Sequence, residues 1–106
     1  ARAVPLFAAP DAKQRHVVDH LTGDAGSPTP PRSVLAESAR IARGQIRPLG
    51  KLAVDDVDAL LFAGGAGVAT ALSNYAEKGG VCDVDPDVVR LLKGCLASRR
   101  PMGFVC

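Results

Sequence analysis

The chain has 106 residues, of which 47% are hydrophobic and 23% charged, and 13 basic residues against 11 acidic ones give a net charge of +2. This composition is that of one folded domain and lies outside the disordered range. The basic residues are scattered, which argues against nucleic-acid binding. The longest apolar run, residues 59–65, is too short to span a membrane, and three widely spaced cysteines indicate free thiols rather than a disulfide framework.

The first half of the chain predicts a strand, a long loop and a helix. Residues 3–9 are apolar and predict a strand that the chain enters part-way, rather than a signal peptide. Residues 10–32 are rich in Gly and Pro, with Pro28, Pro30 and Pro31 close together, and predict a loop. Ser33 is a suitable N-cap for a helix through Ile41, and Gly44 would end it.

The second half alternates strands and helices. Residues 57–63 form a short apolar run between acidic residues and Gly64, which is typical of a central buried strand. Val68, Leu72 and Tyr75 share a face at helical spacing and predict a short helix.

A longer helix and a last strand follow. Asp85-Pro86-Asp87 is a strong helix start, and a clean apolar face follows it, made of Val88, Leu91, Leu92, Cys95 and Leu96. Arg99-Arg100 is interpreted as a solvated turn before the last strand, at residues 102–105.

This order of elements predicts an α/β fold with a parallel, doubly wound sheet that is only partly present. Low aromatic content, 4%, agrees with a core of aliphatic strands and Ala-rich helices. A strand at 102–105 needs a covering element after it. We therefore expect residues 1–106 to be part of a single domain in a longer chain, and not to form a stable monomer alone.

The chemistry of such sheets lies at the carboxyl ends of the strands, and two features fall there. Gly64-Gly65-Ala66-Gly67 follows one strand, and its backbone N–H groups are free to approach a phosphate or an oxyanion. Thr70 stands where a dinucleotide fingerprint has its third Gly, and no Lys-Ser or Lys-Thr pair of a Walker loop follows. A plain strand-to-helix turn without a ligand is the alternative.

Cys106 is the second feature, because it directly follows a short strand at the position of a nucleophile elbow. A helix N-terminus at such a position stabilises the thiolate. Cys82, in a loop, and Cys95, on an apolar helix face, are interpreted as structural. His16 and His20 are spaced like metal ligands, but two ligands do not make a site, so no metal and no cofactor is predicted.

Several segments together resemble a known family. They are His20-Leu21-Thr22-Gly23, the helix from Ser33 to Gly44 with Ile46, Asp58-Ala59-Leu60 leading to Gly64-Gly65-x-Gly67, Leu72-Ser73-Asn74, and Pro101-x-Gly103-Phe104-x-Cys106. The chain is similar over essentially all 106 residues to the bacterial enhancing lycopene biosynthesis proteins and to their vertebrate mitochondrial relatives, the glutamine amidotransferase-like class 1 domain-containing proteins. Both groups belong to the ThiJ/PfpI superfamily.

The resemblance implies a flavodoxin-like, class I glutamine amidotransferase-like sandwich that is usually dimeric. It implies that Cys106 is the nucleophile and that the backbone N–H of Gly65 is an oxyanion donor. It implies glyoxalase-like or deglycase-like activity on small dicarbonyl metabolites. The location would be mitochondrial, or cytoplasmic for a bacterial protein. The acid that supports the cysteine in the family, near the first strand, has no counterpart in this sequence.

Two departures from the family pattern lie beside the glycine turn. Ala63 and Ala66 stand where the family usually has a Pro and an aromatic residue, and their small side chains would loosen the turn. This keeps open a non-catalytic family member with a structural or assembly role. A nucleotide-binding α/β domain is the third alternative.

Overall fold

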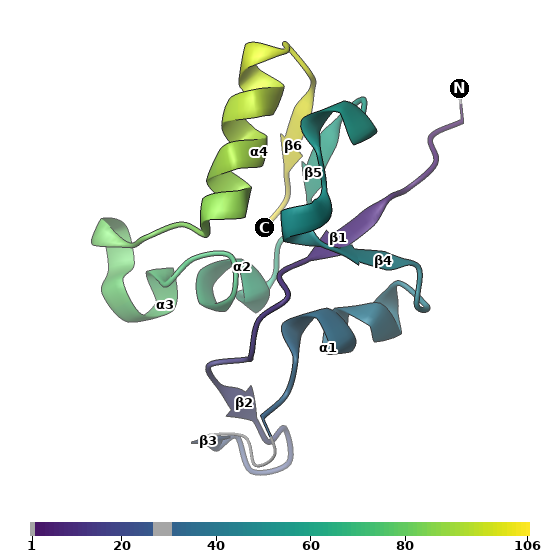
Figure 1. Ribbon diagram of the computed structural model, residues 1–106. Coiled ribbons are helices and arrows are strands. Elements are labelled where there is room, and N and C mark those ends of the chain that lie inside the picture. Colours follow the sequence, from purple (N-terminus) through teal and green to yellow (C-terminus); the bar gives the residue numbers. More distant parts are fainter. Residues whose placement is uncertain (1, 27–30) are drawn as a thin grey trace. The chain divides into compact units, whose positions relative to one another are not determined.

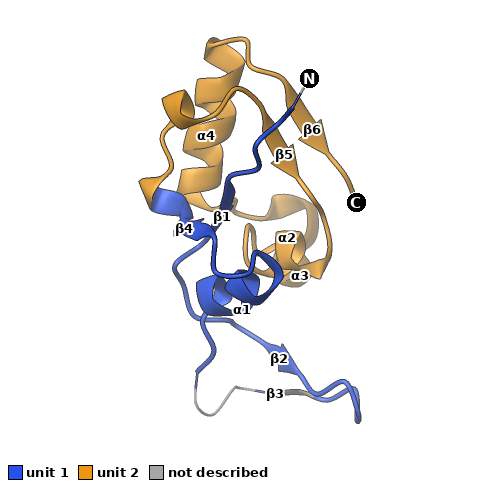
Figure 2. Ribbon diagram, turned by 90° about the vertical axis from the view of Figure 1, so that its right-hand side faces the viewer, with its two compact units in different colours: residues 1–50 blue, residues 51–106 orange. Residues whose placement is uncertain are grey.

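The computed structural model describes residues 2–26 and 31–106 as two compact units, residues 1–50 and residues 51–106 (Figures 1 and 2). Each unit contains a pair of short parallel strands. The parallel α/β class predicted from the sequence is therefore confirmed. Residues 27–30, which include Pro28 and Pro30 of the predicted loop, lie outside the described residues.

In the first unit, β1 (Phe7–Ala9) pairs with β4 (Ile46–Pro48), with Phe7 opposite Ile46 and Ala9 opposite Pro48. The helix α1 (Val34–Ile41) connects the two strands, so the unit is a β-α-β crossover. Strand β1 is shorter than the predicted strand at 3–9. Strand β4 was not predicted, because Arg47 and Pro48 give its three residues no apolar pattern. A 3-10 turn at Leu49–Lys51 follows it.

Helix α1 begins and ends as its sequence predicts. Ser33 caps it, its hydroxyl accepting from the N–H of Ala36 at 3.2 Å. The chain leaves the helix through positive φ angles at Arg43 and Gly44, and the Gly44 N–H donates to the Ala39 carbonyl at 2.8 Å.

Two neighbouring residues at the end of α1 differ in burial. The side chain of Ile41 is 88% exposed, whereas Ala42 is buried together with Ala9 and Leu49. The last turn of the helix therefore packs through its smaller residue.

The predicted loop at 10–32 contains a small antiparallel pair, β2 (Val17–Val18) with β3 (Ala25–Gly26). Its turn is closed by the Asp19 carboxylate, which accepts from the Leu21 N–H at 2.8 Å, and by the Gly23 N–H, which donates to the Asp19 carbonyl at 2.7 Å. Strands of two residues carry no readable periodicity, which explains why they were not predicted.

In the second unit, β5 (Leu60–Phe62) pairs with β6 (Met102–Phe104), and the two strands lie side by side in Figure 1. Strand β5 has three residues instead of the seven predicted, because a bend at Asp58 interrupts the first part of the predicted strand. The prediction that it is fully buried is wrong in part: Leu61 is 68% exposed.

The predicted helix through Val68, Leu72 and Tyr75 is two helices, α2 (Ala66–Thr70) and α3 (Tyr75–Lys78), followed by a 3-10 turn, η3 (Gly79–Val81). Helix α2 stops early, since the Ala71 and Leu72 N–H groups both donate to the Gly67 carbonyl. The face shared by the three residues nevertheless remains on one side, as the pocket described below shows.

Helix α4 (Pro86–Ala97) is the longest element, and its start is confirmed. The Asp85 carboxylate accepts from the N–H groups of Asp87 at 2.8 Å and Val88 at 3.4 Å. The buried residues of this unit are largely on this helix: Val88, Leu91 and Cys95, with Leu52 against them. Cys95 is completely buried, in agreement with its predicted structural role.

Arg100 corrects the prediction of a purely solvated turn. Its guanidinium forms a 2.7 Å ion pair with Asp55 and donates to the Val57 carbonyl at 2.6 Å. The side chain therefore fixes the segment before β5 to the start of β6.

Candidate active site

The two parallel strands of the second unit bring two distant segments together at their carboxyl ends. The pairing continues one residue past β6, where the Val105 N–H donates to the Phe62 carbonyl at 2.9 Å. The rings of Phe62 and Phe104, which are paired residues of the two strands, stack with their centroids 5.3 Å apart. Residues 63–65 and residues 105–106 therefore leave the strand pair next to one another.

The turn after β5 is held in a conformation that only glycine adopts readily. Gly64 and Gly65 have φ angles of +84° and +86°. A Cβ at Gly64 would collide with the carbonyl group of Val105 and lie 3.0 Å from the Cα of Cys106. The backbone of the turn thus passes directly against the residue before Cys106, which requires Gly at position 64.

Gly65 and Cys106, the two predicted site residues, line the same pocket, which has a volume of about 450 Å³. Cys106 is exposed and its thiol is free. Gly65 is the N-cap of α2, and its carbonyl accepts from the Val68 N–H at 3.1 Å. Its own N–H donates to no backbone carbonyl in the part of the chain that the structure describes, so it can serve a bound group.

Three helices contribute part of the remaining pocket wall. Val68 and Leu72 belong to α2 and the turn after it, and Val88 and Leu92 are on α4. Tyr75 at the start of α3 completes the face that the sequence pattern identified. The prediction that Val68, Leu72 and Tyr75 share one apolar face is therefore correct, although the three residues do not lie on a single helix.

Cys82, which was interpreted from its loop position as structural, also lines this pocket. It is half-buried and free. Its neighbour Val84 forms an isolated bridge with Ser73, which closes the loop between them. A loop residue belongs to no periodic apolar pattern, so the sequence does not predict that Cys82 lines the same pocket as Cys106. That position depends on the closure of the loop by the Ser73–Val84 bridge.

Polar contacts of Asp83 hold the segment between Ser73 and Val84 closed. Asn74 and Asp83 are joined by two side-chain hydrogen bonds, one from the Asp83 N–H to the Asn74 Oδ1 at 2.7 Å and one between the side chains at 3.1 Å. Lys78 forms a 2.8 Å ion pair with Asp83. The hydrogen bonds from Lys78 and Asn74 hold the pKa of Asp83 below its ordinary value. Asn74 therefore belongs to the support of the pocket wall and not to its lining.

The lining of this pocket carries no charged side chain among the described residues. Its polar groups are the thiols of Cys82 and Cys106, the hydroxyls of Ser73 and Tyr75, and backbone. The absence of Lys and Arg here gives a nucleotide phosphate no cationic partner. Its lining instead contains a free thiol at Cys106 and the glycine turn at Gly65.

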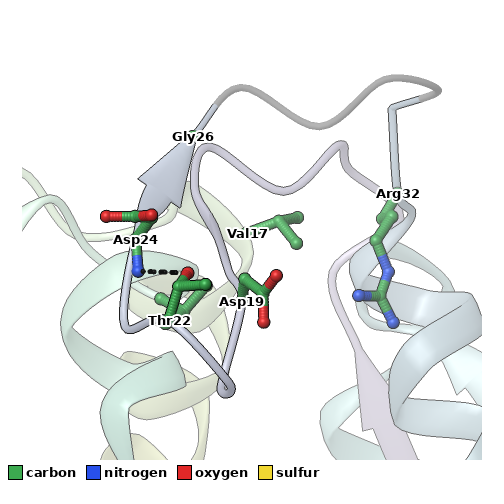
Figure 3. A pocket seen from close by; sticks show the side chains of 7 residues that line it. Val17, Asp19, Thr22, Asp24, Gly26 and Arg32 are labelled. Atoms are coloured by element: carbon green, nitrogen blue, oxygen red, sulfur yellow. Dashed lines mark hydrogen bonds between the residues drawn. The ribbon is translucent and has the colours of Figure 1, made fainter.

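A second depression, of about 500 Å³, lies in the first unit and contains no thiol (Figure 3). Its polar groups serve the β2–β3 turn, as shown by the Asp24 N–H, which donates to the Thr22 hydroxyl at 3.2 Å. Arg32, also on its edge, pairs with Glu37 at 2.7 Å, and this pairing lowers the pKa of Glu37. Several polar groups of this depression, those of Asp19, Thr22 and Arg32, therefore take part in local contacts of the fold.

His16 and His20 are the residues whose spacing is like that of metal ligands. Within residues 2–26 and 31–106, no cluster of three or more His, Cys, Asp or Glu side chains is arranged to hold a metal ion. None of the helices in this part of the chain combines the length and apolarity that crossing a membrane requires.

The parallel strand pairs and their helices agree with the class I glutamine amidotransferase-like fold, and the comparison with solved structures supports this fold. The crystal structure of an isoprenoid biosynthesis protein with an amidotransferase-like domain from Ehrlichia chaffeensis matches 93% of the chain with a TM-score of 0.82 and 32% identity. The matched part is 46% of that protein. A scan against models of protein families gives no match.

Curated proteins give the same relationship. The chain is 46% identical over 103 residues to the mitochondrial ES1 protein homolog of Rattus norvegicus and 45% identical to glutamine amidotransferase-like class 1 domain-containing protein 3, mitochondrial, of Homo sapiens. The ES1 protein of Danio rerio, also mitochondrial, is 35% identical over 100 residues. The chain is thus homologous to the ES1 and glutamine amidotransferase-like class 1 proteins, and it spans 38% of the length of the first two.

Proposed function

We propose that Cys106 is the nucleophile of a glyoxalase-like or deglycase-like enzyme that acts on small dicarbonyl compounds. By resemblance to its relatives the protein would be mitochondrial and would work as a homodimer. The observation that carries the proposal is that Cys106, whose thiol is free, and Gly65 line one pocket at the ends of two paired strands.

The proposed chemistry uses these two groups in one step. The Cys106 sulfur, as thiolate, bonds to an aldehyde or ketone carbon, and the electron pair of the C=O bond moves to the oxygen. The Gly65 N–H is the proposed donor to this oxyanion. No Asp, Glu or His lines the described pocket, so the group that transfers the proton would come from another part of the protein.

Consumption of methylglyoxal by the full-length protein tests the proposal. We expect Cys106→Ser to lower kcat/KM at least about 100-fold, as loss of a nucleophile does. The matched control is Cys82→Ser, which changes a thiol in the same pocket and should keep the rate within a few-fold. Equal rates in all three proteins would contradict the catalytic role.

A non-catalytic role is the second candidate, and Ala63 and Ala66 favour it. Ala66 is the first residue of α2 and Ala63 precedes Gly64, so both small side chains flank the turn that presents Gly65. A less restrained turn positions an oxyanion donor less accurately. Equal rates in the experiment above would support an assembly role instead.

A further inference from the structure

The pocket beside Cys106 is larger and more apolar than a small dicarbonyl requires. Its 450 Å³ is within the range of sites for drug-sized ligands. Val68, Leu72, Val88, Leu92 and Phe104 all contribute to its surface. A polar three-carbon molecule would leave most of this surface without a partner.

We propose that this pocket selects carbonyl compounds that carry an uncharged apolar substituent, an alkyl chain of about four or more carbons, which lies against Val88 and Leu92 while the carbonyl group meets Cys106. The inference rests on the proposed function, because it assumes that the Cys106 thiol faces the substrate.

The Ser73 hydroxyl and the charged side chains near the pocket already have partners, which argues against an anionic or amino-acid substrate. The Ser73 hydroxyl donates to the Val68 carbonyl at 2.8 Å and accepts from the Tyr75 N–H at 3.4 Å. The nearby Lys78 and Asp83 pair with each other outside the lining. A carboxylate or ammonium group entering the pocket would lose its hydration without gaining an ionic partner.

Alkylation of the full-length protein by a series of N-alkyl iodoacetamides measures this selectivity without requiring turnover. In this reaction the Cys106 sulfur forms a bond to the methylene carbon while the C–I bond breaks and iodide leaves. Peptide mapping separates labelling of Cys106 from labelling of Cys82. Because burial of one methylene is worth up to about fourfold in affinity, we expect the N-butyl reagent to label Cys106 at least about tenfold faster than the N-methyl reagent.

Two substitutions on one helix provide the matched control. Leu92→Asn should abolish the preference for the longer chain, because Leu92 lines the pocket. Leu96→Asn, one turn later and 70% exposed, should leave the preference unchanged. Both substitutions add the same amide to α4, so a difference in chain-length preference between the two variants is due to the pocket.

Labelling of Cys106 that does not depend on chain length, or no labelling of Cys106 at all, would overturn the inference, since the pocket would then be filled or closed in the whole protein. Failure of the proposed function looks different. In that case the chain-length preference persists, while Cys106→Ser leaves dicarbonyl consumption unchanged.

Discussion

Gly64 and Gly65 have nearly the same φ angle but different surroundings. A side chain at the glycine turn can therefore cost stability in two ways, through backbone strain and through collision with a neighbour. Alanine at either position is strained at positive φ. At Gly65 an added Cβ meets open space, whereas at Gly64 it meets the backbone of Val105. Backbone atoms cannot turn aside as a flexible side chain can, so the second cost applies at Gly64 alone.

We therefore expect Gly65→Ala to lower the free energy of unfolding by about 1 kcal/mol and Gly64→Ala to lower it by about 3 kcal/mol or more. Urea unfolding of the full-length variants measures both. Gly64→Ala should also displace residues 105–106 and slow alkylation of Cys106. Equal losses of stability in the two variants would show that the turn does not lie against Val105.

At the residue scale, the sequence was sufficient to predict that the glycine turn at residues 64–67 and Cys106 follow apolar strands, whose carboxyl ends lie at one edge of a parallel pair. The choice of Gly65 as the oxyanion donor came from the family resemblance, and the catalytic roles of Gly65 and Cys106 stay predictions. Cys82 was not predicted, because its position depends on hydrogen bonds between Asn74 and Asp83, which are nine positions apart in the chain. Contacts of that kind depend on side-chain geometry that a spacing pattern does not contain.

Among the elements, the helices with side-chain caps were the most predictable. Ser33 and Asp85 each satisfy N–H groups that a helix start leaves free, so a short local pattern determines where α1 and α4 begin. Strand β4 and the break between α2 and α3 lack such a local signal. The bounds of β4 follow from its pairing with β1, and α2 ends where the Gly67 carbonyl accepts two hydrogen bonds. Neither contact can be predicted from the sequence alone.

Gly94 in α4 shows how one element is fitted to another. Glycine is unfavourable inside a helix, and Ala should stabilise it by about 1 kcal/mol. A Cβ at Gly94, however, would collide with the Cγ2 of Val54, a branched side chain with little freedom to move away. The glycine therefore lets the 3-10 turn at Val54–Asp56 lie close to the helix.

A double-mutant cycle tests this packing. Gly94→Ala alone is expected to destabilise the protein by about 1–3 kcal/mol through overpacking. With Val54→Ala in the background the obstruction is removed, so the same Gly94→Ala change should become neutral or stabilising by up to about 1 kcal/mol. Thermal unfolding of the four proteins gives the coupling. A cost that is identical in both backgrounds would argue that Val54 does not restrict Gly94.

For the chain as a whole, each parallel pair has only two strands among the described residues, and such small sheets are marginal by themselves. Side chains alternate between the two faces of a strand. In β5, Phe62 lines the pocket, and the side chain of Leu61 therefore lies on the opposite face. Leu61 pairs with Gly103, its side chain lies next to this glycine, and it is 68% exposed. Phe104 is also 65% exposed. Both faces of the β5–β6 pair thus present apolar surface.

We expect residues 1–106, prepared as an isolated polypeptide, to associate as the concentration rises rather than to remain monomeric, because exposed apolar surface of this kind favours contact between chains. Light scattering coupled to size-exclusion chromatography measures the effect. Leu61→Lys should reduce association, since it places a charge on the exposed face of β5, whereas Ala36→Lys adds the same charge at an exposed position of α1 and should have little effect. A monomer with one cooperative melting transition would contradict this prediction and would mean that the β5–β6 pair is stable with both apolar faces in water.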